Sequence, residues 1–356
     1  MQCQRCLNDG TVRNISFNEQ GICNYCLEYD KIADQLKDHK RLEKLFINRI
    51  NKIKGKYKYD VALGISGGKD SMYVLYQLIN KYHLKVKTFT MNNGFLSDTA
   101  KKNINKMVKE FNVDHEYIEF DHEMLKNIYR YSMSHFLVPC IGCSYIGYAA
   151  MINYTLKTDA GMCIHGRSPE QMLRKYGNDV FTSFVNLGLK DIDDIDINSE
   201  YKAILDSIST KLDKNIKSYI EEILYDGIEG KPFREFVPYF LYHEYDEQEI
   251  IKFLKENTSW NPPKAYNHYD CEIHNAAKYI YQKAEGRAHR LPETSVLIRS
   301  NKITKEEGNK VLQEELIEKP TEELDRLFKF VGLNKNIILI KAKIYNWTLK
   351  KWQNTY

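Results

Sequence analysis

No run of apolar residues in this 356-residue sequence approaches the ~20 residues that a helix needs to span a bilayer. Met1 leads within two residues into a cysteine pair, not into the basic and apolar segments of a signal peptide. The net charge is only +4, which is too small by itself to indicate a nucleic-acid-binding protein. A hydrophobic content of 43% is ordinary for a globular protein. We therefore expect a cytoplasmic protein with no membrane segment.

Cysteines are well represented, and six of the eight stand in C-x-x-C pairs. In a reducing compartment this spacing favours metal binding over disulfide formation. Two pairs, Cys3/Cys6 and Cys23/Cys26, are separated by sixteen residues and predict a tetrahedral four-cysteine zinc site. Because residues 1–30 are too few to form a hydrophobic core, the bound Zn²⁺ would supply the folding energy of this knuckle.

Beyond the knuckle, residues 31–57 show helical periodicity with a basic face, which predicts a helical connector. From there strand-like and helix-like segments alternate, which predicts an α/β fold with a doubly wound parallel sheet over residues 58–230. Residues 179–228 carry no motif and are expected to be an insertion, and residues 231–356 a mainly helical C-terminal region. The expected strands are 61–65, 86–91, 116–120 and 162–165, and the expected helices include 98–111, 123–136, 145–156 and one starting near residue 70.

The first expected strand runs into the sequence SGGKDS, which places anion-binding groups at the start of a helix. Gly67 and Gly68 permit backbone conformations closed to other residues, so that bare N–H groups and the helix N-terminus can face an anion. Ser66 and Ser71 add hydroxyl groups, and Lys69 adds a cation. The pattern predicts a phosphate site that is not of the Walker type, the alternative being an ordinary strand–turn–helix junction.

SGGKDS resembles the PP-loop of the adenine nucleotide alpha hydrolase superfamily, which includes GMP synthetase, argininosuccinate synthetase and tRNA thiolation enzymes. The resemblance implies a Rossmann-like domain that cleaves ATP between the α- and β-phosphates. It also implies that the loop, including Lys69 and Asp70, holds pyrophosphate and Mg²⁺. AMP would pass to a carbonyl oxygen of the substrate, which a nitrogen or sulfur nucleophile then replaces.

Ligands of an open parallel sheet lie beyond the carboxyl ends of its strands, where two further segments are expected. The resemblance places adenosine near Asn92, with Phe95 positioned to stack on it, although an ordinary turn is an equal alternative. The fourth expected strand ends in IHGRSPEQ, which resembles a second superfamily motif with the pattern Gly-His-x-x-Asp-Asp. Gly166 matches, Arg167 stands in the histidine place and would pair with phosphate, and Glu170 would orient magnesium.

A second group of cysteines is spread through the chain. Cys140 and Cys143 are expected at the opening of a helix, whose dipole lowers a thiol pKa. Together with the distant Cys271 they suit a [4Fe–4S] cluster held by three cysteines, with the fourth iron open to a sulfur species. This arrangement resembles that of cluster-dependent tRNA thiolation enzymes. The alternatives are a second zinc with His268 or His274 as a ligand, and a redox or inert cysteine pair.

Two reactions remain open. In the first, an ATP-dependent sulfurtransferase acts on tRNA or a small molecule, with a sulfur donor as partner. The residues expected to act in catalysis are Lys69, Asp70, Cys140, Cys143, Glu170 and Cys271. In the second, residues 293–308 resemble the C-terminal helices of N-acetyl sugar amidotransferases of surface polysaccharide synthesis, which would deliver ammonia from a partner. Those enzymes carry a Trp-Gly-Glu-Asn segment that this chain lacks.

The resemblance also bears on the C-terminal region. In the superfamily the C-terminal helices cover the ATP site, so that Arg299 or Lys302 is expected either to reach phosphate or to lie exposed. Residues 337–356 are apolar and basic, and we expect them to dock as a helix or to form an interface, such as that of a homodimer. A third class of function, a non-catalytic zinc-knuckle adaptor that binds nucleotide, is disfavoured by the intact SGGKDS loop.

Overall fold

A computed structural model of the chain describes residues 1–12, 14–174, 180–209, 212, 214–262 and 270–353. At its centre five parallel strands form one sheet in the order β3-β2-β1-β4-β5. This confirms the predicted α/β class with a parallel sheet. The strands are β1 (Tyr59–Gly64), β2 (Val86–Met91), β3 (Asp114–Ile118), β4 (Ala160–His165) and β5 (Glu235–Pro238).

The strand order reverses between β1 and β4, and this reversal positions the candidate site. Val61 of β1 lies opposite Val86 of β2 on one side and Met162 of β4 on the other. The chain therefore leaves the two central strands in opposite directions along the sheet, which opens a crevice beyond their carboxyl ends. SGGKDS follows β1 and HGRSPEQ overlaps the end of β4, so both sequences border this crevice.

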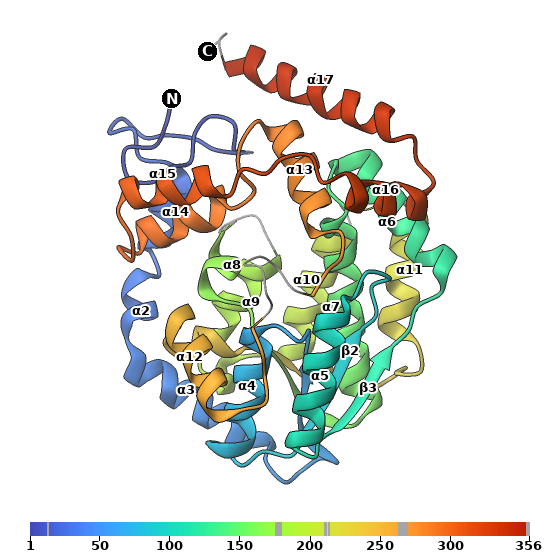
Figure 1. The fold of residues 1–356 in the computed structure, drawn as a ribbon. Coiled ribbons are helices and arrows are strands. Elements are labelled where there is room, and N and C mark those ends of the chain that lie inside the picture. Colours follow the sequence, from blue (N-terminus) through green and yellow to red (C-terminus); the bar gives the residue numbers. More distant parts are fainter. Residues whose placement is uncertain (13, 175–179, 210–211, 213, 263–269, 354–356) are drawn as a thin grey trace.

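Helices cover both faces of the sheet (Figure 1). Alternate residues of β1 face opposite sides, since Leu63 joins the main core whereas Ala62 packs in a smaller cluster with Tyr154. The helices up to β4 are α1 (Asn24–Asp30), α2 (Ala33–Lys37), α3 (His39–Ile53), α4 (Lys69–Asn80), α5 (Asp98–Glu110), α6 (His122–Phe136) and α7 (Cys140–Lys157). Those after β4 are α8 (Pro169–Leu173), α9 (Val180–Gly188), α10 (Ile197–Ser209), α11 (Lys214–Tyr225), α12 (Glu247–Asn257), α13 (His274–Glu285), α14 (Leu291–Arg299), α15 (Lys305–Glu314), α16 (Thr321–Val331) and α17 (Lys335–Gln353).

Several elements differ from the sequence-based expectations. The strand β5 lies within residues 231–356, which were expected to be mainly helical, because a four-residue edge strand that ends in Pro238 carries little strand signal. Strands β1, β3 and β4 each begin two residues before the expected start. Helix α7 begins at Cys140 and not at residue 145. The domain boundaries stay predictions, although β5 belongs to the sheet and lies beyond residue 230.

The N-terminal segment and α17, the last described helix, lie on the same side of the molecule, above the sheet in Figure 1. The N-terminal segment packs against α14 in a separate small core that contains Leu7, Leu291 and Ile298. Within the described residues, no helix combines the length and apolar character needed to cross a membrane.

Candidate functional site

A cleft of about 920 Å³ lies beyond the carboxyl ends of β1 and β4. It brings together segments that are far apart in the sequence. The SGGKDS loop and Gly166–Gln171 line one part of it, Cys143 and Cys271 another, and α14 with Lys302 a third. The structure therefore gathers most of the predicted site residues at one edge of the sheet. Gly67, Asn92 and Cys140 are not among the residues that line the cleft.

The backbone of the SGGKDS loop is fixed by contacts of Gly67 with neighbouring segments of the chain. Gly67 has a φ of +79°, and a Cβ there would lie 2.6 Å from the carbonyl oxygen of Ala100, so only glycine fits. The carbonyl oxygen of Gly67 accepts hydrogen bonds from Trp260 Nε1 at 3.0 Å and from Asn103 Nδ2 at 3.4 Å. The backbone N–H of Ser66 donates to Ser71 Oγ at 3.2 Å. Gly67 thus shapes the loop, while its neighbours face the cleft.

The charged groups of the loop are paired within the protein. Lys69 Nζ lies 3.2 Å from Asp70 Oδ2 and 3.1 Å from Glu247 Oε1. Burial opposes the charge on Lys69, but Asp70 and Glu247 raise its pKa overall. Burial also raises the pKa of Asp70 against the effect of Lys69. Asp70 Oδ1 is buried without a hydrogen-bond partner, which leaves a carboxylate oxygen available to a cation.

Gly166 brings the loop after β4 against this segment. A Cβ on Gly166 would lie 3.0 Å from the backbone of Asp70, so a larger residue would push the two loops apart. Ser168 caps α8 in a capping box and fixes the position of Glu170. Glu170 is only 6% exposed and pairs with Lys302 Nζ at 2.9 Å. Lys302 lines the cleft with its side chain partly exposed, and its contact with phosphate stays a prediction.

His165, at the end of β4, is a cleft residue that the sequence did not single out. Its Nδ1 accepts a hydrogen bond from the backbone N–H of Arg167 at 3.3 Å, which assigns the proton to Nε2. Burial holds the pKa of His165 well below its usual value, with a further lowering by Arg167. The neutral ring stacks at a tilt on Phe236, and its Nε2 is buried without a hydrogen-bond partner.

The three dispersed cysteines approach one another from α7 and from the segment before α13. Asn93 Nδ2 donates to Cys143 Sγ at 3.7 Å, and Cys271 pairs through its backbone with Leu96 after β2. Surrounding protein raises the pKa of Cys140 to about 12 although its side chain is exposed, and burial raises those of Cys143 and Cys271. The expectation of a lowered thiol pKa is wrong, because desolvation outweighs the helix dipole.

Three thiolates suit a [4Fe–4S] cluster, and the cluster and the second zinc both stay predictions for this group. Two of the thiols line the cleft and Cys140 is exposed, so a bound group would keep an open side. Among the described residues, Cys3, Cys6, Cys23 and Cys26 are the one group whose ligand atoms all lie within 4.8 Å of one another. His274 begins α13 and is not in such a group, and His268 lies outside the described residues.

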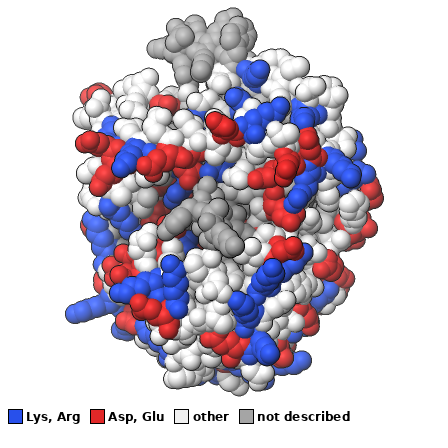
Figure 2. All heavy atoms as spheres, in the orientation of Figure 1, with Lys and Arg blue, Asp and Glu red and all other residues white. Residues whose placement is uncertain are grey.

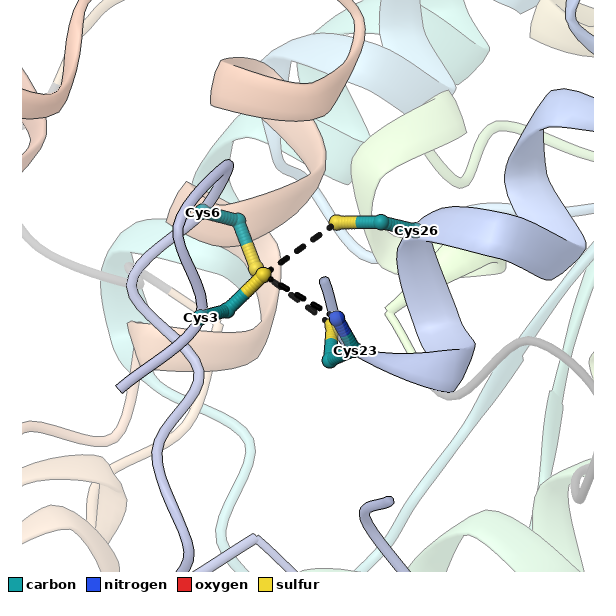
Figure 3. A group of neighbouring side chains, drawn as sticks. All are labelled: Cys3, Cys6, Cys23 and Cys26. Atoms are coloured by element: carbon teal, nitrogen blue, oxygen red, sulfur yellow. Dashed lines mark hydrogen bonds between the residues drawn. The ribbon is translucent and has the colours of Figure 1, made fainter. Parts of the chain in front are cut away.

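The N-terminal cysteines form a closed site (Figure 3). The Sγ atoms of Cys3 and Cys26 are 4.0 Å apart and those of Cys6 and Cys23 are 3.7 Å apart, and all four residues are buried. Zinc bound to four thiolates at about 2.3 Å places neighbouring sulfurs about 3.8 Å apart. The residues therefore fit a tetrahedral metal ion, with no position left for a substrate.

Arg299 lies at this closed site and not at the phosphate loop or on the surface. Its side chain is 1% exposed, and its Nη2 donates to Cys6 Sγ at 3.9 Å. The expectation that Arg299 reaches phosphate or solvent is therefore wrong, because the end of α14 turns toward the knuckle. Phe95 is also misassigned as a stacking residue, since it is 2% exposed and packs against Tyr129 and Phe330.

Several residues around the cleft could not be assigned from the sequence. Asn92 and Asn93 were both expected near the adenosine, but Asn92 bonds to Glu119 at 2.8 Å and only Asn93 lines the cleft, beside Cys143. Glu247 belongs to a run of acidic residues that is evident in the sequence. Nothing in the sequence indicates that Glu247 pairs with Lys69, which lies far away along the chain. Trp260 stands beside a proline pair, and its bond to the loop spans nearly two hundred residues.

Comparisons with known proteins give limited likenesses. No protein-family model matches the chain. An uncharacterized protein of Methanocaldococcus jannaschii, MJ1599, is 26% identical over 145 residues, which is 40% of this chain and 50% of that protein. The chain thus matches only half the length of this relative.

Two solved structures are similar to this chain at low TM-scores. One is the U34-tRNA thiolase NcsA of Methanococcus maripaludis with its [4Fe-4S] cluster, at a TM-score of 0.38 and 14% identity over 89% of this chain and 90% of that chain. The other is the NH3-dependent NAD synthetase of Campylobacter jejuni, at a TM-score of 0.31 and 16% identity over 52% of this chain and 92% of that chain. At these TM-scores the likenesses carry no argument about fold, activity or substrate.

Proposed function

We propose that this protein is an ATP-dependent enzyme of the PP-loop type that activates a substrate carbonyl oxygen with AMP and replaces it with sulfur. The observation that carries the proposal is the shared cleft. The SGGKDS loop and two thiols of the dispersed cysteine group, Cys143 and Cys271, line the same cavity. A carbonyl activated at the loop and a sulfur held by the cysteines would therefore meet in one place.

The loop residues would bind the pyrophosphate part of ATP. The backbone N–H groups at the start of α4 and the hydroxyl groups of Ser66 and Ser71 are suited to phosphate oxygens. Lys69 would exchange its pairing with Glu247 for the phosphates and offset the charge that develops as pyrophosphate leaves. Asp70 and Glu170 would hold Mg²⁺, a role that suits the unpartnered, buried Oδ1 of Asp70.

Cys140, Cys143 and Cys271 would hold the [4Fe–4S] cluster. When bound, such a cluster supplies an open iron to which a sulfur species can attach. Asn93 would help to orient Cys143 through its hydrogen bond to the sulfur. Gly166 and Arg167 would border the α-phosphate side of the cleft, since Gly166 lies against Asp70 and Arg167 is a lining residue.

The test is anaerobic purification followed by metal analysis and an assay of pyrophosphate release. We expect a brown protein with ~4 iron per chain in addition to zinc, and release of pyrophosphate and AMP when a thiocarbonyl product forms. A colourless protein that holds zinc without iron and still forms AMP would contradict sulfur delivery. Absence of pyrophosphate release with every acceptor would contradict the enzymatic proposal as a whole.

A second candidate, an amidotransferase acting on an N-acetyl sugar, has one structural observation in its favour. The segment 293–308, which carries the resemblance to these enzymes, packs on the knuckle and also lines the cleft. Ammonia from a partner would then replace the activated oxygen. Iron-free protein that uses ammonia with an N-acetyl sugar would establish this alternative.

The class of substrate is a carbonyl compound, either a small molecule or tRNA. On the face shown in Figure 2, basic and acidic side chains are interspersed. This distribution supports a small molecule, because RNA binding favours a continuous basic surface. A sulfur donor and a homodimer stay predictions. Ile337, Ile340 and Ile344 form an exposed stripe on α17 that measurements of mass in solution would test for self-association.

A further inference from the structure

Helix α14 connects the closed cysteine site with the cleft. Leu291, Ile298 and Arg299 pack toward the four cysteines, whereas Glu293 and Leu297 line the cleft. A nine-residue helix cannot shift on one side without shifting on the other. The wall of the cleft is therefore mechanically tied to the knuckle.

Arg299 is a buried cation that needs the cysteines as its counter-charge. Its guanidinium donates to the carbonyl oxygens of Ser295 and Tyr25 and to Cys6 Sγ. Among the described residues, no acidic side chain forms an ion pair with it. Four thiolates around one divalent ion carry a net charge of about −2, which would offset a buried guanidinium. Without that charge, Arg299 would be a buried cation without compensation, which is strongly destabilising.

Further contacts join the knuckle to α14 and to the next helix, α15. Arg5 Nη2 donates to the carbonyl oxygen of Arg299 at 2.9 Å. Lys305 Nζ donates to the carbonyl oxygen of Cys3 at 2.9 Å. Gly308 of α15 allows close packing, since a Cβ there would lie 2.7 Å from Ile298 and 3.1 Å from Leu7. The order of α14 thus depends on the order of the metal site.

On the cleft side, two ion pairs connect α14 and the segment after it with α8, so that an ordered α14 also fixes the position of α8. Glu293 pairs with Arg174 at 3.0 Å, directly after α8. Lys302, three residues beyond α14, pairs with Glu170 within α8 at 2.9 Å. Glu170 and Lys302 both line the cleft beside the phosphate loop. A contiguous set of contacts therefore runs from Cys6 to Glu170.

We infer that Arg299 is a positioning residue through which metal at the four-cysteine site sets Lys302 and Glu170 in the ATP cleft. This rests on the proposed function only in naming ATP as the ligand of the cleft. Metal loading would raise the affinity for ATP, and ATP would slow the release of metal by the same factor, since coupling between two bound ligands is reciprocal. The four-cysteine site then supports the reaction without touching substrate.

The first test is hydrogen–deuterium exchange on the full chain, zinc-loaded and metal-stripped under reducing conditions. We expect exchange to rise at least about tenfold in α14 and α8 when metal is removed, with α12 unchanged as the internal control. Faster exchange confined to residues 1–30 would overturn the inference. Loss of protection throughout, including β1 and α12, would also overturn it, because the metal would then be a general requirement for folding.

The second test compares variants in the cobalt-loaded protein. Arg299→Leu should retain cobalt but shift its thiolate absorption band, and both cobalt release and the Kd for ATP should rise about tenfold. Arg299→Lys should rescue part of both effects. The matched control Lys302→Ala should weaken ATP binding while the cobalt band and release rate stay at wild-type values.

The outcomes separate this inference from the proposed function. If Arg299→Leu alters the cobalt band but leaves the Kd for ATP and the exchange of α8 unchanged, the coupling is overturned and the enzymatic proposal stands. If zinc-loaded wild-type protein binds no ATP, the enzymatic proposal fails, and the exchange of α8 still decides the coupling.

Discussion

The two cysteine groups of this protein differ in how far their sulfur atoms are enclosed by the surrounding protein. In the N-terminal group, all four sulfurs are buried and lie within 4.8 Å of one another. In the second group, Cys140 is exposed, and Cys143 and Cys271 open into the cleft. A closed site has no position for a substrate, whereas an open one can present a bound species to a substrate. The contrast predicts different consequences for equivalent cysteine substitutions.

The largest effect is expected for turnover at the open group. Cys271→Ala should lower turnover by at least about 10³-fold, because an essential ligand is lost, while ATP affinity stays near wild type. Product formation and calorimetric ATP titration would measure the two quantities. Cys163→Ala, at a buried cysteine within β4, is the matched control. Full activity in Cys271→Ala would remove the cysteine group from the mechanism.

The closed group should instead control stability. Cys23→Ser should release the bound zinc and lower the free energy of unfolding on the order of 4 kcal/mol, since a buried metal ligand is lost. Urea unfolding with zinc analysis would measure both effects. Cys140→Ser in the open group should leave the unfolding free energy nearly unchanged. Equal destabilisation by both substitutions would erase the distinction between the two groups.

The rate at which the Cys140 thiol is alkylated should show a smaller effect, which depends on pH. In metal-replete protein without a cluster, Cys140 is exposed but its pKa is about 12, so little thiolate forms near neutral pH. Its alkylation rate should rise about tenfold per pH unit between pH 7 and pH 10, because the thiolate fraction grows in that proportion below the pKa. Mass spectrometry after timed iodoacetamide treatment would follow this. A rate that levels off near pH 9 would contradict the raised pKa.

The smallest effect is expected for a substitution of Glu247, which should change ATP binding and leave both cysteine groups unaffected. Glu247 pairs with Lys69 and, under the proposed function, would compete with phosphate for it, so Glu247→Gln should tighten ATP binding about threefold, as expected for a partly exposed ion pair. Glu249→Gln, in the same turn of α12, is the matched control with no expected change. Weaker ATP binding in Glu247→Gln would show that Glu247 helps the site and does not compete with it.

The sequence predicted those parts of the structure that local patterns determine. Continuous buried runs identified β1, β2 and β4, and the spacing of Cys3/Cys6 and Cys23/Cys26 identified the four-cysteine group. Strand β5 was not predicted, because four residues at a sheet edge show no periodic pattern of apolar residues. The place of Arg299 escaped for a different reason, since its partner Cys6 is 293 positions away and nothing near Arg299 in the sequence indicates a buried cation.

The packing of the first residues on α14 and α15 also bears on how the protein is made. Cys3, Cys6, Cys23 and Cys26 are synthesised before Arg299 and Lys305, which follow almost three hundred residues later. At about 5–20 residues per second, the thiols wait on the order of 15–60 s for these contacts. During translation the nascent knuckle must therefore keep its thiols reduced or metal-bound without α14 and α15. Zinc supply during synthesis would then limit the yield of folded protein.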